Sequence, residues 1–247
     1  LQRALEESRI LGEVFHKARN YGEAITLFLE LLDHDPKNVG LRDKLSEFYV
    51  MSDQLDKGLG QLILVAEEMI DRKEWDGAIK AYKKALSIDA KNADIHFRIG
   101  EIFLNQKKNI TEARYEFAKV FELDPTHRKA MEYLVNLYLE EEKPSQAIQV
   151  LTKLTDLDQS YLLLQNKIIS GYQEKIKANP EDIKAHFFLG IIYKELQMWT
   201  KAIEQFQTTR KSKEFVLESH AMLGACFSQQ PPMLSLAIKT LEKGLET

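Results

Sequence analysis

The residues best suited to chemistry in this chain are its histidines, and three of them occupy the same place in a repeated pattern. His96, His186 and His220 each stand three residues before an aliphatic residue of a predicted helix. Histidine can bind zinc or transfer a proton, but both roles need further ligands or an acid at a defined spacing. A residue that recurs with the period of the whole chain is better explained by packing. We therefore expect no catalytic residue, no metal site and no cofactor at these positions.

Other signatures of catalysis are missing from the sequence as well. It contains no phosphate-binding glycine loop, no His-Glu-x-x-His and no Gly-x-Ser-x-Gly motif. Its one cysteine, Cys226, excludes an internal disulfide and a zinc site built from cysteines. Small and apolar neighbours predict that Cys226 is buried. The sequence predicts that the chain is not an enzyme.

Composition narrows the class of partner. The chain has 247 residues, of which 44% are hydrophobic and 29% charged, as in an ordinary folded protein. Its formal net charge of −4 argues against nucleic acid as a ligand, since nucleic acid binding usually needs a basic face. No uncharged apolar stretch reaches about 18 residues, so we expect no direct insertion into a membrane.

A small residue returns at a nearly constant interval and indicates repeated structural units. Ala113 and Ala147 are 34 residues apart, as are Ala24 and Gly58, whereas Ala202 and Ala237 are 35 apart. Such a period is typical of stacked supersecondary units. Within each unit, apolar residues recur three and four positions apart, which predicts two amphipathic helices. In one unit these helices run from about 93 to 106 and from about 111 to 122.

Glycine recurs in the first helix of four of these units, at Gly12, Gly100, Gly190 and Gly224. Glycine inside a helix costs about 1 kcal/mol relative to alanine. Its recurrence predicts a close approach by a neighbouring helix. The small residues of the second helices are followed by an aromatic residue or leucine, which predicts a small-to-large interlock.

These residues resemble the tetratricopeptide repeat, over essentially the whole chain. The fullest match is Leu189-Gly190-Ile191-Ile192-Tyr193, followed by Ala202 and Phe206. The resemblance implies an all-α fold, a right-handed α-solenoid of stacked antiparallel helix pairs. It also implies a concave groove, lined mainly by first helices, in which protein segments bind.

Two places depart from the period and suggest how the chain divides. Gly58 and Ala78 are only 20 residues apart, and Ala147 and Ile168 only 21. The first shortfall predicts one long helix near 55–72 that serves two pairs; the alternative is a long second helix with a degenerate partner. The second predicts a long linking helix at 160–178. We expect an array of about five repeats at 1–158, then the linking helix and two further repeats at 159–247.

The resemblance also selects residues for the concave face. Phe97 and Phe187 are the expected aromatic anchors, because a buried aromatic contributes more to an interface than charges at its rim. The alternative for any single residue is an exposed helix position without a ligand. The full set expected on this face is Phe97, Glu101, Asn105, Lys129, Glu132, Asn136, Phe187, Ile191 and Lys194.

The resulting hypothesis is a non-catalytic scaffold that binds a protein or peptide partner within a multiprotein assembly. The repeats are rich in isoleucine and lysine and close to the family consensus, which suggests bacterial envelope, secretion, pilus or motility machinery. The alternative is a regulatory or targeting segment of a larger enzyme. A third reading is a homodimer through the final helix, whose apolar face we expect to be uncovered. The chain starts at Leu1 without Met. We expect a cytoplasmic fragment, with the periplasm left open.

Overall fold

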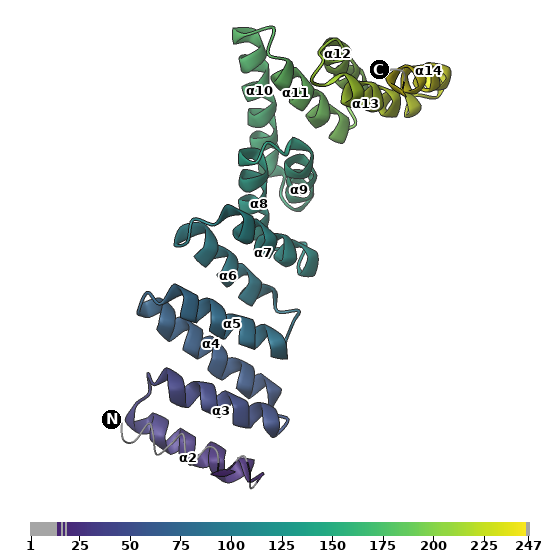
Figure 1. The fold of residues 1–247 in the computed structure, drawn as a ribbon. Coiled ribbons are helices and arrows are strands. Elements are labelled where there is room, and N and C mark those ends of the chain that lie inside the picture. The colour runs from purple at the N-terminus through teal and green to yellow at the C-terminus, as the bar shows by residue number, and fades with distance from the viewer. Residues whose placement is uncertain (1–13, 16, 18, 246–247) are drawn as a thin grey trace. The chain divides into compact units, whose positions relative to one another are not determined.

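The computed structural model describes residues 14, 15, 17 and 19–245, and these fall into two compact units, Leu1–Pro125 and Thr126–Thr247. Each unit is a series of helices joined by short connections (Figure 1). The described residues contain no strand, and the all-α fold of antiparallel helix pairs is confirmed. The first unit holds α2 (Tyr21–His34), α3 (Val39–Met51), α4 (Leu55–Asp71), α5 (Trp75–Ile88), α6 (Ala93–Asn105) and α7 (Ile110–Leu123).

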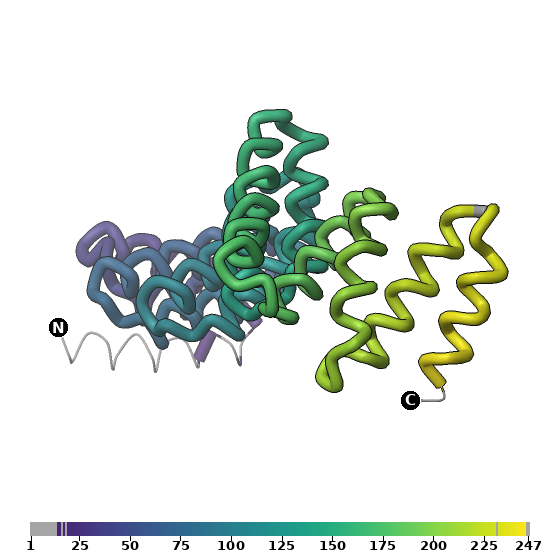
Figure 2. The backbone as a smooth tube through the Cα atoms, turned by 90° about the horizontal axis from the view of Figure 1, so that it is seen from above, coloured from purple at the N-terminus to yellow at the C-terminus, as the bar shows by residue number. Residues whose placement is uncertain are grey.

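The second unit has the same kind of organisation, with two short 3-10 turns added. Its elements are α8 (Arg128–Glu140), α9 (Pro144–Leu157), η1 (Gln159–Tyr161), α10 (Leu162–Ala178), α11 (Ile183–Glu195), α12 (Trp199–Thr209), α13 (Val216–Ser228), η2 (Pro231–Met233) and α14 (Leu234–Leu245). The hairpin of α13 and α14 is clear in the tube view, where its two helices run side by side in opposite directions (Figure 2).

Local sequence signals start several of these helices. Asn92 precedes α6, and its side-chain oxygen accepts a hydrogen bond from the backbone N–H of Ile95 at 3.2 Å. Asp182 does the same for Ala185 at the start of α11, at 2.9 Å. Such caps satisfy backbone donors that a helix leaves unpaired at its first turn.

Close contacts between glycine and a large side chain join the helices of a hairpin. A β-carbon on Gly100 would lie 2.7 Å from the ring of Phe117, and one on Gly224 would lie 2.5 Å from Leu241. The predicted close approach is confirmed at Gly100, Gly190 and Gly224, whereas Gly12 lies outside the described residues. Within these hairpins the interlock is a direct consequence of the repeated sequence pattern.

Helix α4 packs against both of its neighbours in the chain, α3 and α5. The hydroxyl of Ser46 donates to the carbonyl oxygen of Gly58 at 2.8 Å, which joins α3 to α4. At the other end, Met69 of α4 fills the space beside Gly77 of α5. This helix covers the segment for which the sequence predicts a shared helix.

Helix α10 packs in a different way from every other helix of its unit described above. None of its residues is buried, and Ile169, Tyr172 and Ile176 are its side chains that pack against the core containing α11. There the ring of Tyr172 meets Phe188 edge-on, with centroids 6.2 Å apart. Helix α9 also packs directly against α11. The sequence-based division at 158/159 falls inside the second unit and stays a prediction.

Candidate partner-binding surface

On α6, the three residues selected from the sequence differ in their exposure. Phe97 belongs to the core: it is only 9% exposed, and its ring lies 5.7 Å from that of Phe117. Glu101 is half-buried, with a carboxylate oxygen 3.8 Å from a guanidinium nitrogen of Arg98. Asn105 is exposed at the end of the helix. Asn105 is therefore the member of this group best placed to meet a ligand.

Helix α8 carries three further predicted residues on successive turns. Lys129 and Asn136 are exposed, whereas Glu132 is half-buried. The hydroxyl of Tyr161 in η1 donates a hydrogen bond to the carboxylate of Glu132. This hydrogen bond raises the pKa of Tyr161 above its usual value of 10.0. Glu132 thus holds η1 against α8, and the exposed pair Lys129 and Asn136 remains as surface.

On α11, Phe187 lies in the core of the second unit. It is 7% exposed, and its ring stacks on Phe215 with centroids 4.5 Å apart. Ile191 is half-buried against the same core. In this structure the rings of Phe187 and Phe97 are both buried and pack against neighbouring aromatic rings, and their role as anchors for a partner stays a prediction.

Lys194, the last predicted residue, belongs to a polar junction between α9 and α11. Its ammonium group lies 2.8 Å from Oε1 of Glu195. The same oxygen accepts a hydrogen bond from Ser145 of α9 at 2.9 Å, and Oε2 accepts one from Gln149 of α9 at 3.0 Å. Burial alone would raise the pKa of Glu195, but the hydrogen bonds from Lys194, Gln149 and Ser145 hold it below its usual 4.5. The carboxylate is charged and joins the two helices.

The structure places the predicted residues in both units. Those of α6 share one helix of the first unit, and those of α8 and α11 lie on two helices that each pack against α9. Within the second unit, α9 thus connects the two helices that carry predicted residues.

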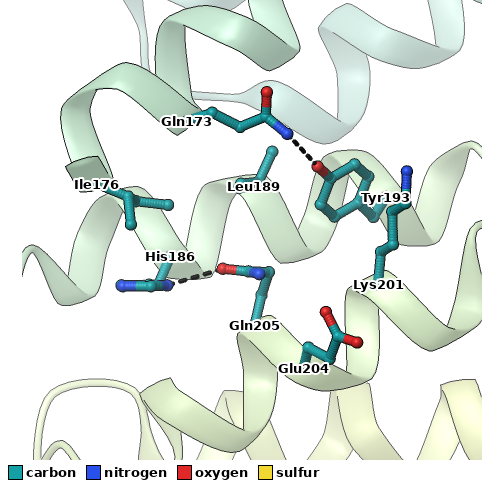
Figure 3. Close-up of a pocket in the computed structure, with 8 residues that line it drawn as sticks. All are labelled: Gln173, Ile176, His186, Leu189, Tyr193, Lys201, Glu204 and Gln205. Carbon is teal, nitrogen blue, oxygen red and sulfur yellow. Dashed lines mark hydrogen bonds between the residues drawn. The ribbon is translucent and has the colours of Figure 1, made fainter. Parts of the chain in front are cut away.

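A cleft in the second unit was not foreseen from the sequence. It has a volume of about 320 Å³ and is formed by α10, α11 and α12 (Figure 3). Gln173 donates to the hydroxyl oxygen of Tyr193 at 2.9 Å on one side. His186 pairs with Gln205 at 2.7 Å on the other. The lining residues are Gln173, Ile176, His186, Leu189, Tyr193, Lys201, Glu204 and Gln205.

The histidines that share a register make the same contact in two hairpins. Nδ1 of His96 lies 2.6 Å from Oε2 of Glu116, just as His186 pairs with Gln205. Each acceptor stands three residues after the small alanine of its second helix. His220 is 5% exposed and its Nδ1 has no hydrogen-bond partner in the structure. The equivalent acceptor position is occupied by Thr240, a shorter side chain.

The described part of the chain shows no group of three or more histidine, cysteine, aspartate or glutamate residues arranged to hold a metal ion. Burial raises the pKa of the Cys226 thiol to about 11, so this residue is a poor nucleophile at neutral pH. Among the described residues no helix is long and apolar enough to cross a membrane.

Comparisons with known proteins agree with the repeat pattern. A family model described as TPR repeat matches residues 67–107, which cover the end of α4 and all of α5 and α6. Tetratricopeptide repeat protein 21A of Mus musculus is 24% identical over 163 residues, or 65% of this chain and 12% of that protein. SPINDLY of Hordeum vulgare, named as a UDP-N-acetylglucosamine–peptide N-acetylglucosaminyltransferase, is 21% identical over 198 residues, or 79% of this chain and 17% of that protein.

Among solved structures, the crystal structure of MamA is 21% identical, covers 76% of this chain and 90% of that one, and has a TM-score of 0.36. The chain thus spans less than a fifth of the length of the two curated relatives. The match at 67–107 coincides with helices that repeat the same interlock along the chain. Residues 67–107 therefore match the tetratricopeptide repeat, and the hairpins at Gly190 and Gly224 carry the same glycine-to-large interlock outside that segment.

Proposed function

We propose that this chain is a non-catalytic scaffold that binds a segment of a partner protein on the exposed faces of its first helices. The observation that carries the proposal is the division of α8 into two faces. Met131, Leu134 and Val135 are buried at 1% exposure or less, whereas Lys129 and Asn136 are exposed. Because the buried face fixes the helix, its polar face is held ready, and little ordering entropy opposes binding.

The finer proposal is an adaptor in a multiprotein assembly, with bacterial envelope, secretion, pilus or motility machinery as the leading settings and the cytoplasm as the leading compartment. The net charge of −4 supports a protein ligand over nucleic acid. Since the curated relatives are far longer than this chain, the role of any whole protein that contains it belongs to this proposal.

Affinity capture tests the proposal. Residues 1–247 serve as bait in a lysate of the source cells, and partners are identified by mass spectrometry. We expect one stoichiometric partner that is lost with Asn136→Arg or Asn105→Arg. Asn166→Arg is the matched control, because Asn166 is an exposed asparagine of α10, a helix that carries none of the predicted residues. Equal capture by all variants would contradict the assigned surface.

A second candidate function is the regulatory or targeting segment of a larger enzyme. The observation that favours it is the name of the Hordeum vulgare relative, a transferase of which this chain covers 17%. Sequencing the complete gene product decides between the two. A catalytic domain in the same polypeptide would support the enzyme setting, and a product made of repeats alone would oppose it.

A homodimer through α14 is the third candidate, and the surface of that helix supports it. Leu234, Ile238 and Leu241 are 54%, 55% and 45% exposed. Contiguous exposed apolar residues of this kind mark interaction sites. Light scattering after size-exclusion chromatography should give a mass that rises with protein concentration and falls to the monomer value in Ile238→Glu. A constant monomer mass would remove this candidate.

A further inference from the structure

We propose that the cleft between α10, α11 and α12 binds a peptide segment in which one acidic residue stands next to an aliphatic residue. This inference rests on the proposed protein-binding function, but it concerns a surface separate from the exposed residues of α6 and α8. At about 320 Å³ the cleft is large enough for one or two side chains of a ligand.

Two donors at one end of the cleft define the acidic part of the ligand. The hydroxyl oxygen of Tyr193 accepts a hydrogen bond from Gln173, and its own hydrogen makes no bond to any described residue. Tyr193 is only 4% exposed, so the backbone and ring around this hydroxyl are fixed. The ammonium group of Lys201 lies 5.6 Å from the centroid of the Tyr193 ring and pairs with no carboxylate among the described residues. Both groups lie on the same side of the cleft (Figure 3).

An unused hydroxyl donor and an unpaired ammonium group together favour a carboxylate. Hydrogen bonds that involve a charged partner are stronger than neutral ones, and a carboxylate can accept from both donors at once. The floor of the cleft continues with the side chains of Leu189 and Ile176, which favour an aliphatic side chain beside the acid.

A carboxylate on the same side of the cleft as Lys201 limits the number of negative charges that a ligand can carry (Figure 3). Glu204 is exposed on α12, three residues after Lys201, and its carboxylate would repel a second acid. The imidazole of His186 is already engaged on both nitrogens, with Gln205 at 2.7 Å and the carbonyl oxygen of Pro180 at 3.2 Å. The cleft therefore selects a single acidic residue over an acidic run or a phosphate.

The test is an NMR titration of ¹⁵N-labelled protein, residues 1–247, with N-acetyl-Glu-Leu-amide. We expect saturable shifts at Gln173, Tyr193 and Lys201, with a dissociation constant on the order of 1 mM for so small a ligand. N-acetyl-Gln-Leu-amide should bind roughly tenfold more weakly, because it lacks the charge.

Two variants locate the donors. Lys201→Met keeps the aliphatic part of an exposed side chain, and Tyr193→Phe keeps the ring. Each variant should bind the acidic peptide roughly tenfold more weakly. Lys239→Met, on α14, is the matched control and should bind as the wild type does. Equal affinity for the two peptides, shifts that map elsewhere, or no saturation would overturn the inference.

The outcome separates this inference from the proposed function. A partner captured from lysate through Asn136 would leave the scaffold proposal intact even when the acidic peptide does not bind the cleft. Conversely, selective binding of the acidic peptide with no captured partner would support the cleft as a binding site. It would contradict the proposal that α6 and α8 carry the partner-binding surface.

Discussion

A β-carbon on Gly190 would lie 2.7 Å from Cε1 of Phe206, a separation that real β-carbons essentially never show. The helices α11 and α12 are therefore packed at a distance that only glycine permits. Phe206 is fully buried and cannot turn outward. We expect Gly190→Ala to lower the free energy of unfolding by about 1 to 3 kcal/mol, because overpacking forces the helices apart. Urea unfolding monitored by circular dichroism measures this change.

Gly171 is the matched control for that experiment. It lies in the middle of α10, and a β-carbon there would meet nothing within 4 Å. Gly171→Ala should raise the free energy of unfolding by up to about 1 kcal/mol, through helix propensity alone. If both substitutions shifted stability in the same direction, the close approach at Gly190 would not be the controlling factor.

The hairpins could be predicted from the sequence because small and large residues alternate at a fixed period. The structure contains each close helix approach that the glycine pattern predicts among the described residues, at Gly100, Gly190 and Gly224. Exposure was harder to predict. Phe97 and Phe187 sit at positions that a family pattern assigns to a groove, and the pattern does not show that each ring also reaches the aromatic ring of the following helix and is buried there.

The cleft was missed for a different reason. Its residues come from three helices, and α10 lacks the regular pattern that would place Gln173 or Ile176 beside α12. The pairing of His186 with Gln205 could have been found, because the acceptor also follows the repeat period. A search for polar residues in register on both helices of a hairpin would have identified it.

The buried contact between His96 and Glu116 gives a second prediction. Their side chains are 12% and 6% exposed, so removal of one leaves the other unpaired inside the protein. Each single change to leucine should cost about 1 to 3 kcal/mol, and the double variant should cost clearly less than the sum. Ala130 and Val150 occupy the equivalent positions of α8 and α9 and are both buried, so an apolar pair fits this register. Additive losses in urea unfolding would contradict the coupling.

His220 offers the reverse experiment. Thr240 stands where Glu116 and Gln205 provide acceptors in the other hairpins. Thr240→Gln should supply a partner for the unpaired Nδ1 and raise the free energy of unfolding by about 1 kcal/mol. Thr240→Leu, of similar bulk but with no acceptor, is the control. A thermal midpoint raised equally by both variants would assign the gain to packing instead.

The hydrogen bonds and the ion pair of Glu195 predict that the stability of the folded chain depends on pH. Because its pKa is lower in the folded chain than the usual 4.5, its stabilising contribution is present above that value. The contribution is lost as the pH falls through the folded pKa. At pH 7, Glu195→Gln should lower the free energy of unfolding by roughly 1 to 3 kcal/mol. This difference should shrink toward zero in strong acid, as followed by urea unfolding across pH. A difference that grows on acidification would exclude the assignment.

Cys226 should be nearly unreactive in the native protein. Its thiol is fully buried and has a pKa raised to about 11. The ordinary pKa of a cysteine thiol is about 8.5, so far less thiolate is present in the folded chain at pH 7. Modification of the native protein by Ellman's reagent should therefore be at least about 100-fold slower than modification in urea. Ala225→Cys, on the same helix but exposed, provides a reactive comparison. Native modification as fast as that of the comparison variant would contradict the buried thiol.

The pairing of His96 with Glu116, and of His186 with Gln205, has a consequence for how such an array can change by recombination. Each partner lies on the other helix of the same hairpin, so a crossover between hairpins leaves both pairs whole. A crossover inside a hairpin would join a histidine to a foreign helix and bury an unmatched imidazole. The hairpin is thus the smallest segment that keeps each of these histidines with its partner, and engineered chimeras of this chain should be cut at Asp89–Asn92 or Asn179–Asp182, outside those pairs.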